Sequence, residues 1–222
     1  MLNDPLPEQT WIYQLDRARG TVLFEAQRSQ LSVALPIAPC SGRSAWRHPG
    51  AVRSSWCPTR SAATSDTPEM RAGTTCFLGV NVEGALFSVG DGHYRQGEGE
   101  SCGTAVEGAM DVTLIVELVK GGAPAWPRLE HDDHYAVVGS ARPLEDAWRA
   151  SQLGMIHWLG ELYDLDPLDA YQLLTQVSRS PLANVCDTNY SALTKVDKAL
   201  LPTADAYGGM HRHLREQSAA LR

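Results

Sequence analysis

The chain has 222 residues, 43% hydrophobic and 20% charged, with a formal net charge of −7 at pH 7. This composition is typical of a globular domain. The acidic net charge gives no electrostatic reason to expect nucleic acid binding. No apolar run approaches the roughly 20 residues of a membrane-spanning helix. Five cysteines without a CxxC pair argue against a disulfide framework and a thiolate zinc site. No signal peptide is visible, so we expect a cytoplasmic protein that binds neither nucleic acid nor membrane.

The first part of the chain is rich in predicted strands. Short segments containing β-branched residues occur at 21–26 and 31–38 and are typical of strands. Residues 39–66 contain four arginines but no Ile, Leu, Phe or Met, and show neither strand nor helix periodicity. We expect this segment to be irregular. Strand patterns resume further along, at 74–89, 112–120 and 134–141.

Helices are predicted from about residue 143 to 178. Apolar residues recur there at mainly helical spacing, and His157 within this pattern is expected to be packed rather than to bind a ligand. Asp166 and Pro167 have the pattern of an N-cap followed by the first helical position. The polar segment 203–222 is expected to be a loosely attached helix with His-Arg-His on its exposed face. The predicted fold class is α+β and β-dominated: a β-sandwich or barrel-like body over residues 8–141, followed by a helical C-terminal layer.

A Gly-rich stretch, GALFSVGDGHYRQGEGE at residues 84–100, carries chemically active side chains. Asp91 and His93 are two residues apart, so in extended backbone both point to one side, and Glu100 can fold back toward them across the glycines. An Asp/His/Glu set suits Zn or another divalent ion. One alternative is a wide turn with a solvated, charged tip. Another is a tight Gly-rich turn in which Asp91 and Glu100 cap backbone amides and His93 packs beside them.

A second polar cluster, HDDH at residues 131–134, precedes a predicted strand. We favour the interpretation that it is a polar turn leading into that strand.

The stretch GVNVEGALFSVGDGHYRQGEGESCGTAVEGAMDVTL resembles the acetamidase/formamidase family, whose pattern includes G-A-L-F-S-x-G-D-x-H-x-x-Q-G-D/E-G-E. The resemblance covers roughly residues 8–38 and 66–202. It implies an amide hydrolase that releases ammonia from short linear amides, a β-dominated fold with a helical C-terminal part, and a homo-oligomer. It also implies that Asp91, His93 and Glu100 border the active centre as catalytic groups and metal ligands, with Gln96 and Glu98 binding substrate. Water activated by a divalent metal or by a base would attack the small amide substrate.

Two departures from the family pattern lead to further expectations. The chain resembles only the later part of the family domain, so we expect a partial domain at 8–202, without the N-terminal part, and a polar tail at 203–222. Residues 39–65 lack the Gly-Val-Ala-Pro and Gly-Gly-Asn motifs of the family. Back-translation with GC-rich codons restores both motifs in one alternative frame, which suggests an out-of-frame segment and an impaired site. The competing interpretations are a non-catalytic β-sandwich binding module and an inactive remnant.

Overall fold

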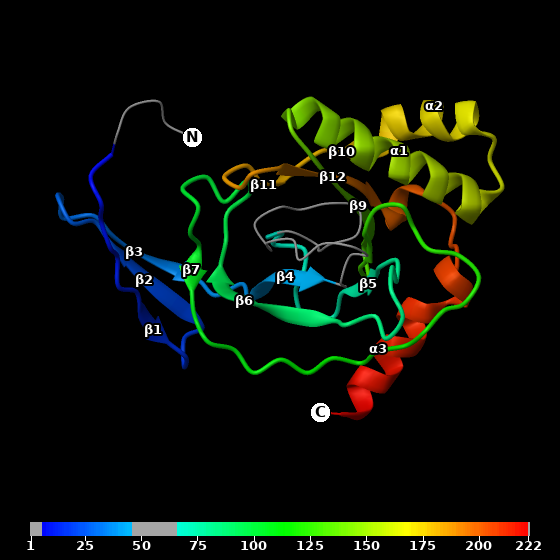
Figure 1. The fold of residues 1–222 in the computed structure, drawn as a ribbon. Coiled ribbons are helices and arrows are strands. Elements are labelled where there is room, and N and C mark those ends of the chain that lie inside the picture. Colours follow the sequence, from blue (N-terminus) through cyan, green and yellow to red (C-terminus); the bar gives the residue numbers. More distant parts are fainter. Residues whose placement is uncertain (1–5, 46–65, 222) are drawn as a thin grey trace.

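The computed structural model describes residues 6–45 and 66–221, and its strands form three antiparallel sheets (Figure 1). The first sheet is a meander of β1 (Gln14–Asp16), β2 (Thr21–Glu25) and β3 (Ser32–Pro36). The Asp16 carboxylate accepts the backbone N–H of Arg19 at 2.9 Å, which stabilises the turn between β1 and β2. Strands β2 and β3 confirm the strands predicted at 21–26 and 31–38.

The second sheet carries the Gly-rich stretch. It consists of β4 (Cys40–Ala45), β6 (Ser88–Arg95) and β7 (Val106–Glu107), in the order β4-β6-β7. Two expectations were wrong here. Residues 40–45 are not irregular, because they pair with β6 in a register that places Cys40 opposite His93. The stretch 90–95 is a strand rather than a loop, and it pairs with β4 on one edge and β7 on the other. The rest of the expected irregular segment, 46–65, lies outside the described residues.

The third sheet forms the centre of the molecule. Its order is β10 (Ser178–Arg179), β12 (Tyr190–Asp197), β9 (His134–Ala141), β8 (Arg128–Glu130) and β5 (Thr75–Phe77), and β11 (Leu182–Asn184) also pairs with β12. Every residue of β9 up to Ser140 is buried, so both faces of this strand are covered. Strands buried on both faces read as continuous apolar runs rather than alternating ones, as the sequence YAVVG does.

Two apolar layers cover the faces of this sheet. The helices α1 (Leu144–Tyr163) and α2 (Pro167–Val177) lie over one face (Figure 1), where Tyr135 and Val137 pack against Trp158 and Leu159. A Cβ at Gly139 would lie 2.2 Å from a backbone oxygen of α1, so only glycine permits this close helix-to-strand contact. On the other face a smaller cluster forms, with Met70 and Cys76 at its margin.

The helical layer was largely predicted from the sequence. Asp166 accepts the N–H groups of Leu168 and Asp169 as an N-cap with Pro167 at the first turn, as expected. His157 is exposed on α1, so the expectation that it packs was wrong. The strands β10, β11 and β12 lie within the C-terminal part and were not predicted. The α+β, strand-rich class with a helical C-terminal region is confirmed.

The last helix is firmly attached to the body. After the short 3₁₀ segments η1 (Lys198–Leu200) and η2 (Ala206–Gly208), α3 (Met210–Ala220) follows. His211 is buried and contacts Thr75 Oγ1 at 2.8 Å and Asp132 Oδ1 at 3.0 Å, and Arg215 also binds Asp132. The expected loose attachment was therefore wrong, and the expected exposed face holds only for Arg212 and His213, because His211 is a buried anchor.

The segment 112–120 differs from its prediction as a strand. It is extended backbone that pairs with no strand among residues 6–45 and 66–221, and it runs along the edge of the molecule (Figure 1). Most of its apolar side chains are exposed, including Val116 at 65% and Leu118 at 70%. Of the predicted strand 74–89, only residues 75–77 and 88–89 lie in sheets. Alternating sequence predicts extended conformation, but a strand also needs a partner for its backbone groups. Within the described residues, no helix has the length and apolar character needed to span a membrane.

Candidate active site

Strand β6 brings Asp91 and His93 together. Their side chains meet, and His93 Nε2 lies 3.4 Å from Asp91 Oδ1. His93 is almost fully buried, with 1% of its surface exposed. Glu107 on the paired strand β7 sits opposite His93 in the register, and its Oε2 lies 3.2 Å from the same Nε2.

Gln96 orients the imidazole of His93. The side-chain nitrogen of Gln96 donates to the backbone carbonyls of Asp66 and of Ala183, the latter at 3.1 Å, so its side-chain oxygen is an acceptor. His93 Nδ1 lies 2.9 Å from that oxygen and therefore carries the proton. This hydrogen bond directs Nε2 toward the carboxylates.

Glu100 reaches the same region from the turn after β6. Asn184, fully buried on β11, donates its side-chain nitrogen to Glu100 Oε2 at 2.9 Å and to Asp66 Oδ2 at 3.0 Å. The Asn184 oxygen accepts the backbone N–H groups of Cys186 and Asp187. Glu100 thus binds side chains rather than capping a backbone amide, which removes that alternative for this residue.

The carboxylates surround His93 from two sides. Potential ligand atoms of Asp66, Asp91 and His93 lie within 4.8 Å of one another, and so do those of His93, Glu100 and Glu107. The structure therefore brings all three predicted residues to one imidazole, but Asp91 and Glu100 flank it in separate groups.

Three residues of this cluster were not predicted as site residues. Glu107 was part of the matched family pattern, so its signal was present in the sequence. Asp66 lies beside the segment that had been interpreted as irregular. Asn184 is 84 residues from Glu100 in the chain, and only the fold brings the two together.

The protonation of the cluster reflects its dense negative charge. Burial is the largest single influence on His93 and opposes its charge, but hydrogen bonding with Cys40 and Gln96 and the nearby carboxylates together outweigh it. These carboxylates belong to Glu107 and Asp91, and the pKa of His93 is raised to about 10. Burial also raises the pKa of Glu100 above its ordinary value. The cluster favours one added positive charge at its centre, whether a proton or a metal cation.

The backbone is unusual at the acidic residues. Asp66, Asp91 and Glu100 have positive φ angles of 46°, 63° and 43°, a region that non-glycine residues rarely adopt. Such conformations cluster at functional sites, where the surrounding structure compensates for their cost. Gly42 on β4 lies directly against the carboxylates of Asp66 and Asp91. A Cβ at this position would lie 2.5 Å from Asp66 Oδ1 and 2.7 Å from Asp91 Oδ2.

The two residues predicted to bind substrate differ in position. Gln96 is buried, and its side-chain oxygen and nitrogen both have partners within the protein. Glu98 is exposed on the turn after β6 and belongs to neither ligand group around His93.

The site can hold a divalent cation. One imidazole and four carboxylates form a donor set of oxygen with nitrogen, which suits ions such as Zn²⁺ or Mn²⁺. Nδ1 of His93 is hydrogen-bonded, so Nε2 is the atom available for coordination, an arrangement typical of metal-binding histidines.

Comparison with known proteins gives the class of this fold and site. Residues 46–137 match the model of the Acetamidase/Formamidase family. The acetamidase of Yersinia enterocolitica has a similar structure, with a TM-score of 0.82 and 35% identity, covering 91% of this chain and 59% of that one. The acetamidase of Bacillus halodurans gives a TM-score of 0.74 and 26% identity, with coverage of 82% and 60%. The family-model match and the similarity to solved acetamidases support assignment of this chain to the acetamidase/formamidase family.

A sequence relative agrees with this assignment. The acetamidase of Mycolicibacterium smegmatis is 39% identical over 93 residues, which are 41% of this chain and 22% of that protein. The chain therefore spans about a fifth of this curated relative and about three fifths of the two solved structures. The family match begins at residue 46, inside the proposed out-of-frame segment 39–65, and sequencing of the parent gene beside a relative tests that hypothesis.

Proposed function

We propose that this protein hydrolyses short linear amides such as formamide or acetamide to a carboxylate and ammonia at the His93 cluster. The observation that carries the proposal is a buried imidazole surrounded by carboxylates in a chain of the acetamidase/formamidase family. Asp91, His93 and Glu100 are the proposed catalytic residues and also the proposed metal ligands, with Asp66 and Glu107 beside them.

The chemistry needs a proton acceptor and a proton donor. A water oxygen attacks the carbonyl carbon, the carbon–nitrogen bond breaks, and the leaving nitrogen gains a proton. Asp91 is partly exposed beside His93 and is placed to accept the proton of the water. We propose that Asp91 then returns this proton to the leaving nitrogen, while Glu100, which accepts a hydrogen bond from Asn184, adds negative charge that holds the positive centre of the cluster.

A divalent ion such as Zn²⁺ held by Asp91, His93 and Glu100 would polarise the amide carbonyl and make a bound water more acidic. Without it, the His93 imidazolium supplies the positive charge near the developing negative charge of the carbonyl oxygen. Gln96 orients His93 in both cases. Glu98, exposed on the adjoining turn, is proposed to contact the amide substrate from the solvent side.

An ammonia-release assay with formamide and acetamide tests this proposal. Because the chain spans 59% of the Yersinia acetamidase, the assay should include a chimera in which this chain replaces the corresponding part of that protein. We expect activity that is lost in His93→Ala and Asp91→Asn and kept in Glu145→Gln, an exposed carboxylate on α1. Equal rates for the chimera and its His93→Ala variant would refute the assignment and favour a binding module. Elemental analysis of the same samples reports the metal and its identity.

Two further proposals concern assembly and location. We propose a homo-oligomer because most apolar side chains of 112–119 are exposed, and large exposed apolar patches mark interaction sites. Light scattering of the purified protein tests this, and a monomer at all concentrations would contradict it. We also propose a cytoplasmic location, in keeping with four free cysteines among the described residues, which cell fractionation would test.

A further inference from the structure

A second cluster of ionisable residues lies apart from His93, at the turn between β8 and β9. The backbone N–H of His131 donates to the carbonyl of His134 at 2.9 Å and closes a two-residue turn formed by Asp132 and Asp133. Residues facing each other across such a turn bring their side chains close together. The two imidazole rings accordingly stack, with centroids 4.1 Å apart and planes 16° from parallel.

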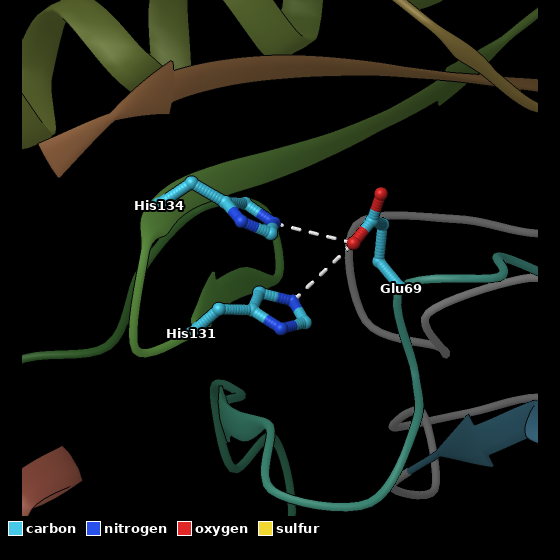
Figure 2. Close-up of side chains that lie close together, drawn as sticks. All are labelled: Glu69, His131 and His134. Carbon is cyan, nitrogen blue, oxygen red and sulfur yellow. Dashed lines mark hydrogen bonds and ion pairs between the residues drawn. The ribbon is translucent and has the colours of Figure 1, made fainter. Parts of the chain in front are cut away.

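Glu69 completes this cluster from a distant part of the chain. It lies on a turn in which Met70 N–H donates to the Thr67 carbonyl. Figure 2 shows the Glu69 carboxylate facing both rings, with Oε2 at 3.2 Å from His134 Nε2 and 3.5 Å from His131 Nε2. The other oxygen, Oε1, binds the ammonium group of Lys195, which leaves Oε2 for the histidines.

The hydrogen bonds around the rings determine where their protons lie. The Thr74 hydroxyl donates to the Glu69 carbonyl at 2.9 Å, so toward His131 Nδ1, at 3.3 Å, it acts as an acceptor. His134 Nδ1 lies 2.6 Å from Asp133 Oδ1 and donates to that carboxylate. Both Nδ1 atoms therefore carry protons. Either Nε2 can approach Glu69 Oε2 favourably only with a further proton, as in the hydrogen bond of His134 at 3.2 Å, or with a cation between the two atoms.

This arrangement leaves an electrostatic conflict. His131 is 4% exposed, and its Nε2 is buried without a hydrogen-bond partner. A nitrogen lone pair facing a carboxylate oxygen is repulsive unless a positive charge lies between them. The same pattern, with Nε2 atoms converging and Nδ1 atoms held by a hydroxyl or carboxylate, is how metal-binding histidines are oriented.

The distances match those of a coordinated ion. Bonds of about 2.0–2.2 Å to nitrogen and oxygen at tetrahedral angles separate neighbouring ligand atoms by about 3.3–3.5 Å. The two separations from Glu69 Oε2 are 3.2 and 3.5 Å, and potential ligand atoms of all three residues lie within 4.8 Å of one another.

We propose that Glu69, His131 and His134 form a second binding site for a divalent transition-metal ion of the Zn²⁺ type. Two imidazoles and one carboxylate are a set that Zn²⁺ prefers, with one coordination position left for water. The ion joins the 67–70 turn to the β8–β9 turn. Glu69 is three residues from Asp66. The bound ion therefore also stabilises the segment that carries Asp66, one of the carboxylates of the His93 cluster.

Cobalt binding to metal-stripped protein tests this site. Co²⁺ replaces Zn²⁺ in such ligand sets and gives visible absorption bands. The titration uses a His93→Gln background, so that it reports on the second site whether or not the proposed hydrolysis is correct. We expect one equivalent of Co²⁺ with these bands. His131→Gln and His134→Gln should each weaken binding by more than about 100-fold, and Asp133→Asn by about 10–100-fold, the usual cost of losing a group that orients a ligand.

The matched control is His157→Gln, an exposed histidine on α1, which should bind Co²⁺ as the His93→Gln protein does. Circular dichroism confirms that each variant is folded. Zn²⁺ should raise the melting temperature of the control but not of His131→Gln, because an ion that binds only the folded state stabilises it. Absence of Co²⁺ binding to the His93→Gln protein, or binding unchanged by His131→Gln and His134→Gln, would overturn the proposal.

Discussion

His93 donates its Nδ1–H to the side-chain oxygen of Gln96 at 2.9 Å. Gln96 cannot rotate to present its nitrogen instead, because that nitrogen already donates to the backbone carbonyls of Asp66 and Ala183. One buried amide thus sets the orientation of the imidazole and joins β6 to the segments that supply Asp66 and Asn184.

Replacing this amide should affect activity more than folding. In Gln96→Met the side chain is of similar size, but His93 loses its acceptor and two backbone carbonyls lose a donor. We expect ammonia release to fall about 10–100-fold and the free energy of unfolding to fall by about 1–3 kcal/mol. The measurements are the amide assay in the Yersinia chimera and urea denaturation. Activity equal to that of the Glu145→Gln control would show that Gln96 does not position a catalytic group.

Gly42 provides a test of the close approach between β4 and the acidic residues. A methyl group there would lie 2.5 Å from Asp66 Oδ1 and 2.7 Å from Asp91 Oδ2, so Gly42→Ala must displace both carboxylates. We expect a loss of about 1–3 kcal/mol in stability and a fall in activity. On the paired strand β6, Gly90→Ala is the matched control, because a Cβ at that position would have nothing within 4 Å of it. Similar effects of the two substitutions would contradict the steric argument.

The local elements were predictable where one short pattern determined them. The N-cap at Asp166 and the helix starting at Pro167 follow from adjacent residues, and the apolar run of β9 marks a strand buried on both faces. Strand β12 was missed, although it pairs with β9 along its whole length. The segment 112–120 shows the opposite error, since its alternation predicts a strand but no described strand pairs with it. Pairing is a tertiary property that a single segment does not encode.

The candidate site, like the fold, was predictable only where neighbouring residues determine its geometry. Asp91 and His93 lie two apart on one strand, so local geometry predicts that they meet. Asn184 and Glu107 join them only through sheet pairing and the turn after β6. The histidines of HDDH were interpreted as part of a polar turn, and the turn is present. Their burial depends on Glu69, which no local pattern connects to them.

Glu100 should control the reactivity of a neighbouring thiol. Burial and then the charge of Glu100 raise the pKa of Cys186 to about 11, with Sγ lying 3.9 Å from Glu100 Oε2. Thiolate is the reactive form, so Cys186 should be alkylated slowly near neutral pH. Glu100→Gln removes one cause of the raised pKa, and we expect faster alkylation by iodoacetamide, measured by mass spectrometry of peptides. Cys76, whose pKa burial raises to about 12, should stay unreactive in both proteins. An unchanged rate at Cys186 would exclude a charged Glu100 beside it.

The raised pKa of His93 predicts how stability depends on pH in metal-stripped protein. The folded-state pKa is about 10, compared with an ordinary value of 6.5, so the folded state binds this proton more tightly than the unfolded state. The stabilisation is fully present below about pH 6.5 and is lost as the pH rises through about 10. His93→Gln lacks this contribution. The melting temperature of the parent protein should therefore exceed that of His93→Gln by more at about pH 6 than at about pH 10.5, measured by circular dichroism in EDTA. Other groups titrate in both proteins and cancel in the difference. A difference that stays constant over this range would show that His93 is not held as an imidazolium by Asp91 and Glu107.

In protein loaded with Zn²⁺, the difference in melting temperature between the parent protein and His93→Gln should depend less on pH, because Nε2 of His93 then carries no proton.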